Sequence, residues 1–116
     1  MSRRYEIAAG FASRIERELR RLGRWREEPP QDSAFDSQTA FFADTMSFEQ
    51  WLQFVLLPRI AETIAEKGKF PKESSVGAYA VRWLDGDNEA DPLKQLLSEF
   101  DWYLEEGKLP GWDQGR

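Results

Sequence analysis

Residues 47–67 constrain the fold most, because this helical stretch carries apolar residues on nearly every side. Before Pro58 the apolar residues share one face of a helix, and after it they fall on nearly the opposite face. A helix that is apolar on most sides is surrounded by other elements. An interior proline also removes a backbone hydrogen bond and bends a helix. We therefore expect a kinked central helix with Trp51 and Leu56 buried.

Three further helices are predicted from apolar residues spaced three and four apart. They cover about residues 4–22, 76–84 and 91–106, and no stretch shows the alternation of a strand. The short helix over 76–84 groups five apolar residues on one face, namely Val76, Tyr79, Ala80, Trp83 and Leu84. The chain is thus predicted to be all-α.

Capping residues mark the ends of two of these helices. Ser47, with Gln50 three residues later, matches a capping box at the start of the central helix. Asp91 directly precedes Pro92, which predicts Asp91 as the N-cap of the last helix. Gly107 follows the last apolar position and is expected to end that helix.

The segment 24–45 is predicted to be a long loop, because prolines and polar residues interrupt any period. Phe35, Phe41 and Phe42 are expected to pin this loop to the core, although a ligand-binding loop is the alternative. The expected architecture is one domain over residues 1–116. It is a four-helix bundle with a kinked central helix and a long aromatic loop between the first two helices.

The composition excludes many chemistries. The chain has no cysteine and no histidine, so it lacks thiolate ligands, cysteine nucleophiles and the commonest general base. The acidic run of Asp85, Asp87, Glu89 and Asp91 places Ala90 and Leu96 where a calcium loop needs glycine and glutamate. No residue pattern joins a nucleophile to a base. We therefore expect no bound metal, no cofactor, no catalytic residues and no enzyme activity.

No stretch approaches the roughly 20 apolar residues that a membrane-spanning helix needs. Charged residues near the start also interrupt any apolar core of a secretion signal. A cytoplasmic protein without a membrane partner is expected.

Charge is divided unevenly along the chain. Residues 1–26 carry a balance of +5, whereas residues 27–116 carry −10. On the first helix a basic face lies opposite the apolar stripe and is formed by Arg14, Arg17, Arg20, Arg21 and Arg24. Such a row is a candidate polyanion-binding site, because guanidinium groups suit successive phosphates. The alternative is an ordinary solvated face on which the arginines pair with nearby glutamates.

Two other sets of residues are candidate sites. Trp102 projects away from the apolar stripe of the last helix, and Trp112 lies in the tail, so both are candidates for a protein interface. The tail could equally fold back over Trp102. Asp44, Trp51 and Arg59 are candidates for lining a pocket.

Two stretches of sequence point to a family. The run Phe41-Phe42-Ala43-Asp44-Thr45-Met46 is followed by Trp51-Leu52-Gln53-Phe54-Val55-Leu56-Leu57-Pro58-Arg59. Together with Trp25-Arg26, Pro29, Phe35 and a leucine-rich last helix, these stretches resemble the YqcC-like family of small bacterial helical proteins. The resemblance implies a compact helical bundle. Because its members are often encoded beside a tRNA pseudouridine synthase, it also implies an accessory role in RNA modification.

Three hypotheses for function follow. The favoured one is a non-catalytic helical accessory or adaptor protein that binds another protein. The alternative is an accessory of RNA modification that binds RNA or another polyanion through the arginine face. Its partner would then be RNA or an RNA-modifying enzyme. The least favoured is an enzyme with a pocket near Asp44. Assembly of the chain into a homo-oligomer is compatible with each of these hypotheses.

Overall fold

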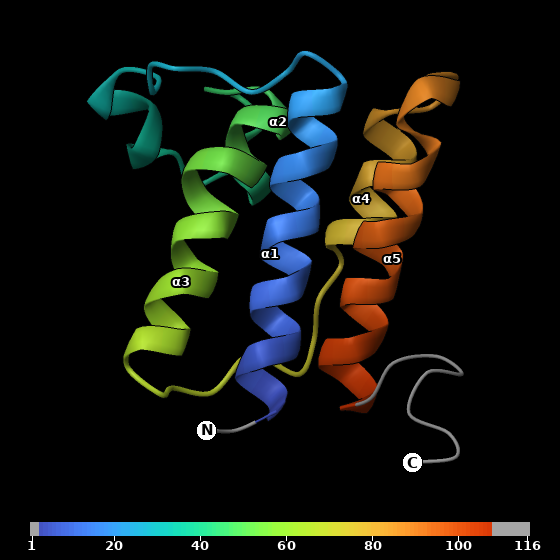
Figure 1. Cartoon of the computed structure of the whole chain (residues 1–116). Coiled ribbons are helices and arrows are strands. Elements are labelled where there is room, and N and C mark those ends of the chain that lie inside the picture. Colours follow the sequence, from blue (N-terminus) through green and yellow to red (C-terminus); the bar gives the residue numbers. More distant parts are fainter. Residues whose placement is uncertain (1–2, 108–116) are drawn as a thin grey trace.

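The computed structural model describes residues 3–107, which form helices and turns without any strand (Figure 1). The α-helices are α1 (Arg3–Arg21), α2 (Phe48–Trp51), α3 (Leu57–Ala65), α4 (Val76–Trp83) and α5 (Asp91–Glu106). A π-helical segment, η3 (Leu52–Leu56), joins α2 to α3 without a break. Within the described range the chain is therefore a bundle of four helices, as predicted.

The central helix begins as its sequence predicts. The backbone N–H of Gln50 donates to the Ser47 hydroxyl over 3.1 Å, and the Gln50 side chain accepts from the Ser47 backbone over 2.9 Å. This reciprocal capping box satisfies two backbone donors that the first turn of a helix leaves free. Trp51 and Leu56 are both buried, as expected.

The irregularity of this helix lies just before Pro58 rather than at the proline itself. In η3 the hydrogen-bonded turn contains one residue more than in an α-helix. The backbone N–H of Leu57, for example, donates to the carbonyl of Leu52, five positions earlier. Pro58 follows in the first turn of α3, where it has no backbone N–H to donate. The helix changes direction between α2 and α3 (Figure 1). A π-turn is a recognised cause of such a bend.

Helix α1 runs through the middle of the fold and packs against both α3 and α5. Its buried residues repeat at helical spacing and are Ala8, Phe11, Ile15 and Leu19. Phe11 meets Phe100 of α5 edge to face, with ring centroids 5.3 Å apart. The predicted apolar stripe of the first helix is therefore its core face.

Helix α4 packs closely on α5, and a carboxylate of α5 caps its first turn. The carboxylate of Asp101 accepts the backbone N–H groups of Val76 and Gly77 over 3.1 and 2.7 Å, and it also accepts the Ser74 hydroxyl. A Cβ atom at Gly77 would lie 2.6 Å from the Cα of Ser98, so glycine permits this close approach.

Two expectations about these helices were wrong. Asp91 is not the N-cap of α5, because the 3₁₀ turn η4 (Asn88–Ala90) runs directly into the helix and Ala90 takes the cap position. Asp91 accepts instead from Lys94 over 3.0 Å. Trp83 lies on the same face of α4 as Tyr79, on which its ring stacks, but it is 44% exposed and not part of the core. Gly107 does end α5, with a φ of +75°.

The loop between α1 and α2 contains two 3₁₀ turns, η1 (Asp32–Asp36) and η2 (Ala40–Phe42). Phe35, Phe41 and Phe42 pack half-buried against the core, as predicted. Within residues 3–107 no helix is long and apolar enough to cross a membrane.

Candidate functional site

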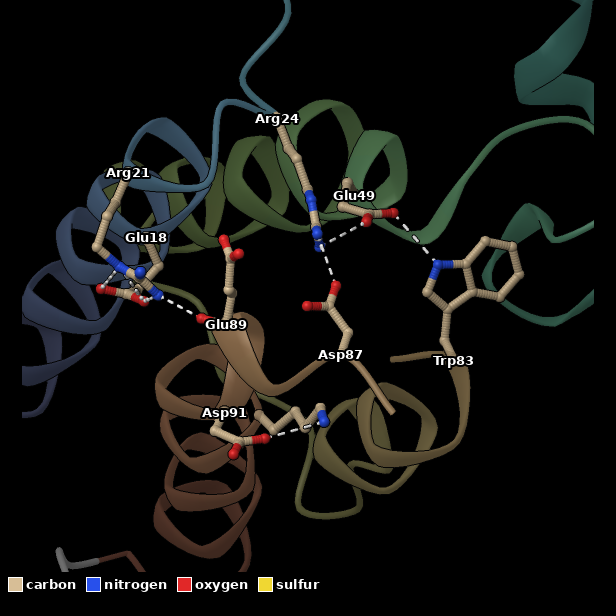
Figure 2. Close-up of polar contacts among 9 residues, drawn as sticks. Glu18, Arg21, Arg24, Glu49, Trp83, Asp87, Glu89 and Asp91 are labelled. Carbon is tan, nitrogen blue, oxygen red and sulfur yellow. Dashed lines mark hydrogen bonds and ion pairs between the residues drawn. The ribbon is translucent and has the colours of Figure 1, made fainter. Parts of the chain in front are cut away.

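Arg24, just past the end of α1, lies in a polar cluster between α2 and the α4–α5 turn (Figure 2). Its guanidinium donates to Asp87 over 2.6 Å and to Glu49 over 3.3 Å. The Arg24 hydrogen bond lowers the pKa of Asp87, as does the positive charge of Arg24, against a smaller opposing effect of burial. One arginine thus joins three parts of the chain and is directed inward.

Arg21 is also engaged within the fold (Figure 2). It makes a bidentate ion pair with Glu18, with its closest contact at 2.7 Å, and donates to the backbone carbonyl of Glu89 over 2.7 Å. The hydrogen bond to Glu18 raises the pKa of Arg21. Arg20 pairs with Glu16 over 2.8 Å and lies over the Trp25 ring.

The other two arginines of the row face α5. Arg14 donates to the carbonyl of Gly10 and lies over the ring of Phe11. Arg17 is exposed and makes no ion pair within the described residues. Both line a hollow of about 310 Å³, which also contains Glu99. The predicted row is therefore split between three arginines that form ion pairs with carboxylates of this chain and two that lie beside α5.

An aromatic row leads from the surface near this cluster toward the core. The Trp83 indole N–H donates to Glu49 over 3.2 Å, while its ring stacks on Tyr79 with centroids 6.1 Å apart. Tyr79 stacks in turn on Phe41 at 4.2 Å, and Phe41 meets Trp51 edge to face at 4.8 Å. Large apolar side chains exposed by 44–50% are Trp83, Val81 and Trp102.

The segment that presents Phe41 has an unusual backbone. Phe41 and Phe42 take φ values of +57° and +52°, a region that side chains with a Cβ rarely adopt. Asp44 accepts a hydrogen bond from the Ser37 hydroxyl, which lowers the pKa of Asp44. The Thr45 hydroxyl donates to the carbonyl of Ala34 over 2.7 Å. These side-chain contacts fasten the two aromatic residues in place despite their backbone strain.

An apolar groove lies on the other side of Phe41. Its volume is about 480 Å³, and Trp51 and Arg59 both line it. Asp44, the third residue predicted for this pocket, does not line it and is exposed. Trp51 and Arg59 therefore share this groove without Asp44, and the carboxylates that line it are those of Glu62 and Glu73.

Trp102 lies on α5 with 45% of its side chain exposed. Trp112, the other residue predicted for a protein interface, lies outside the described residues. Among residues 3–107, no group of three or more carboxylate, histidine or cysteine side chains could hold a metal ion.

Comparisons with known proteins identify relatives of the chain. A family model described as tRNA pseudouridine synthase C matches residues 9–103. The uncharacterized protein YqcC of Escherichia coli K12 is 38% identical over 87 residues, which are 75% of this chain and 78% of YqcC. The chain belongs to the YqcC family. The solution NMR structure of E. coli YqcC superimposes with a TM-score of 0.81 at 25% identity, covering 99% of both chains.

A further relative of this YqcC-family chain is a much longer protein. The protein of Pectobacterium carotovorum named tRNA pseudouridine synthase C is 38% identical over 72 residues. These residues are 62% of this chain but only 19% of that protein. A YqcC-like segment therefore forms a minor part of a chain that bears the name of an RNA-modifying enzyme.

Sequence reasoning on this YqcC-family member missed Gln53, Glu49 and Asp101 as organising residues. Gln53 is buried in η3 and bonds in both directions with the backbone of Arg26. A glutamine between apolar neighbours on a predicted buried helix was the one available signal. Glu49 and Asp101 carried none, because each resembles an ordinary helical surface charge.

Proposed function

We propose that this chain is a non-catalytic accessory protein that binds a protein partner, and that the partner is a tRNA pseudouridine synthase. The observation that carries the proposal is the aromatic row. Trp83 is 44% exposed, and Tyr79 and Phe41 stack behind it toward the core. A tryptophan fixed by stacking loses little freedom on binding, and tryptophan is enriched among residues that dominate interface energies.

The class of partner is inferred from the relatives. A YqcC-like segment makes up 19% of a protein named tRNA pseudouridine synthase C. Within that longer protein, the covalent chain holds the YqcC-like segment close to the rest of the protein. A YqcC-like protein that is a separate chain needs a binding surface to reach the same position. This supports an RNA-modifying enzyme as the partner and supports a surface on the accessory domain that recognises protein.

The charges favour a protein partner over direct RNA binding. Arg20, Arg21 and Arg24 are engaged by acceptors of this chain, which lowers their availability to phosphates. Arg14 and Arg17 lie beside Glu99, whose charge opposes a polyanion. RNA binding through these two arginines is therefore the weaker alternative.

Binding of the purified full chain to the tRNA pseudouridine synthase C of the same organism, measured by calorimetry, tests the proposal. We expect a saturable complex that Trp83→Ala weakens by tenfold or more. Trp102→Ala is the matched control, because Trp102 is equally exposed on another helix. If only the Trp102 variant weakens the complex, the aromatic row is the wrong surface. If the wild-type chain does not bind the synthase, or binds tRNA alone with steep salt dependence, the proposal is wrong.

A further inference from the structure

The bundle has a gap on one side. Helix α1 packs against both α3 and α5, whereas α3 and α5 make little direct contact with each other. Helix α4 covers only part of α5, because it begins opposite Asp101 and has eight residues against sixteen. The last turn of α5 therefore lacks a helical neighbour on this side. The apolar groove described above lies here, lined by α3, α5 and residues 70–76.

The walls of this groove are largely apolar. Six of the lining side chains are large and buried, namely Trp51, Leu56, Ile60, Phe70, Phe100 and Leu104. A volume of about 480 Å³ can take several large apolar side chains, and it falls within the range of about 300–1,000 Å³ typical of binding pockets. An amphipathic helix places residues i, i+3, i+4 and i+7 into such a groove.

The polar part of the lining carries uncompensated charge. Glu62 of α3 and Glu73 of the α3–α4 connection line the groove, and so does Arg59. None of the three makes a side-chain ion pair within the described range. Two free carboxylates against one free guanidinium leave the groove acidic. An occupant with basic residues beside its apolar stripe complements these charges.

We propose that the groove receives a short amphipathic helix of the partner, with an apolar stripe and basic flanking residues. This inference rests on the proposed function, because it places the partner on a particular surface. The groove is continuous with the aromatic row through Phe41, which lines the groove and stacks on Tyr79. The partner helix thus completes the open side of the bundle, while the rest of the partner contacts Trp83.

The test uses the purified full chain and the purified tRNA pseudouridine synthase C. The double variant Glu62→Lys and Glu73→Lys reverses the free carboxylates, and we expect it to weaken the complex by tenfold or more. The matched control is Glu27→Lys with Glu28→Lys, which changes the net charge equally at exposed positions of the α1–α2 loop. Thr63→Trp, on a half-buried residue of the groove, should block the groove and weaken the complex similarly. Methyl NMR should show the largest shifts at Ile60, Val76 and Leu104.

The outcomes separate the two proposals. If the synthase binds, Trp83→Ala weakens the complex and the groove variants do not, the groove inference is wrong and the proposed function stands. Methyl shifts confined to residues outside the groove would count equally against it. If the groove variants instead abolish self-association of this chain, the occupant is a second copy and the inference is overturned. If the wild-type chain does not bind the synthase, both proposals fall.

Discussion

The side chain of Gln53 pairs with the backbone of Arg26 in both directions. Its amide nitrogen donates to the Arg26 carbonyl over 2.6 Å, and its amide oxygen accepts the Arg26 N–H over 2.9 Å. Gln53 lies in the π-helical segment η3 and is the one polar residue among the buried side chains of the described range. It therefore ties the chain leaving α1 to the bend of the central helix.

Replacing Gln53 with leucine should destabilise the fold by about 1–3 kcal/mol, because the Arg26 N–H and carbonyl lose their partners while apolar volume is kept. Urea denaturation of the purified variant measures this loss. Gln38→Leu, at an exposed position of the loop, is the control and should change little. Equal unfolding midpoints for wild type and Gln53→Leu would contradict the anchoring role of Gln53.

Gly77→Ala should destabilise the protein by about 1–3 kcal/mol or more, because an added Cβ would overpack a tight helix contact. It would lie 2.6–2.9 Å from backbone atoms of Ser98 and Leu97, which cannot move without shifting α5. Gly10→Ala is the matched change within α1, where the nearest atom is an Arg14 nitrogen at 3.8 Å. That variant should gain about 0.5–1 kcal/mol from helix propensity. Thermal melts of the two variants should shift in opposite directions, and a shared direction would refute the close packing of α4 on α5.

Asp101→Ala should loosen the start of α4 at a cost of about 0.5–2 kcal/mol, the usual effect of losing an N-terminal cap. The backbone N–H groups of Val76 and Gly77 lose their acceptor in this variant. Hydrogen exchange should quicken at these two amides before it quickens in the core. Glu105→Ala, on an exposed residue of α5, should leave both rates unchanged. Unchanged protection of these amides in Asp101→Ala would show that the carboxylate is not their cap.

Asp87 should titrate below the ordinary aspartate range, because the hydrogen bond and charge of Arg24 favour its carboxylate form. A carboxyl group whose pKa is lower in the folded state than in the unfolded state stabilises the fold. This stabilisation is fully present at a pH above the unfolded-state pKa, and it is lost as the pH falls through the folded-state pKa. The loss is therefore expected below about pH 3.9, the unperturbed value for aspartate.

Carboxyl-detected NMR titration of wild type and Arg24→Gln measures the effect. The Asp87 pKa should rise in the variant. The Asp44 pKa should not change, because the hydrogen bond from Ser37 is the main cause of its lowering. An Asp87 pKa that does not change in Arg24→Gln would show that the ion pair does not form in solution.

The candidate site was only partly predictable, and the reason differs between residues. Trp51 and Arg59 both belong to the central helix that the apolar pattern predicted, and both line the groove. Asp44, the third candidate for this pocket, lies in the loop that precedes the central helix. The 3₁₀ turn before it instead directs Asp44 to Ser37 and out to solvent. Proximity along a loop does not specify direction, because each turn rotates the following side chains.

The positions of the helices were determined by the sequence alone. Apolar spacing and capping residues act within a few positions of the chain, so α1, the capping box at Ser47 and the stop at Gly107 were all predictable. The all-α class follows from the same local patterns.

The partners of the polar side chains were decided by tertiary structure alone. Arg24 meets Asp87 across 63 positions, and Asp101 caps a helix that begins 25 positions earlier. The exposure of Trp83 depends on which face of α4 packs against α5, and the apolar pattern of an eight-residue helix was too short to decide this. A hydrogen bond requires its donor and acceptor to lie about 3 Å apart in space. For residues far apart in the sequence, only the packing of the helices brings the two atoms that close.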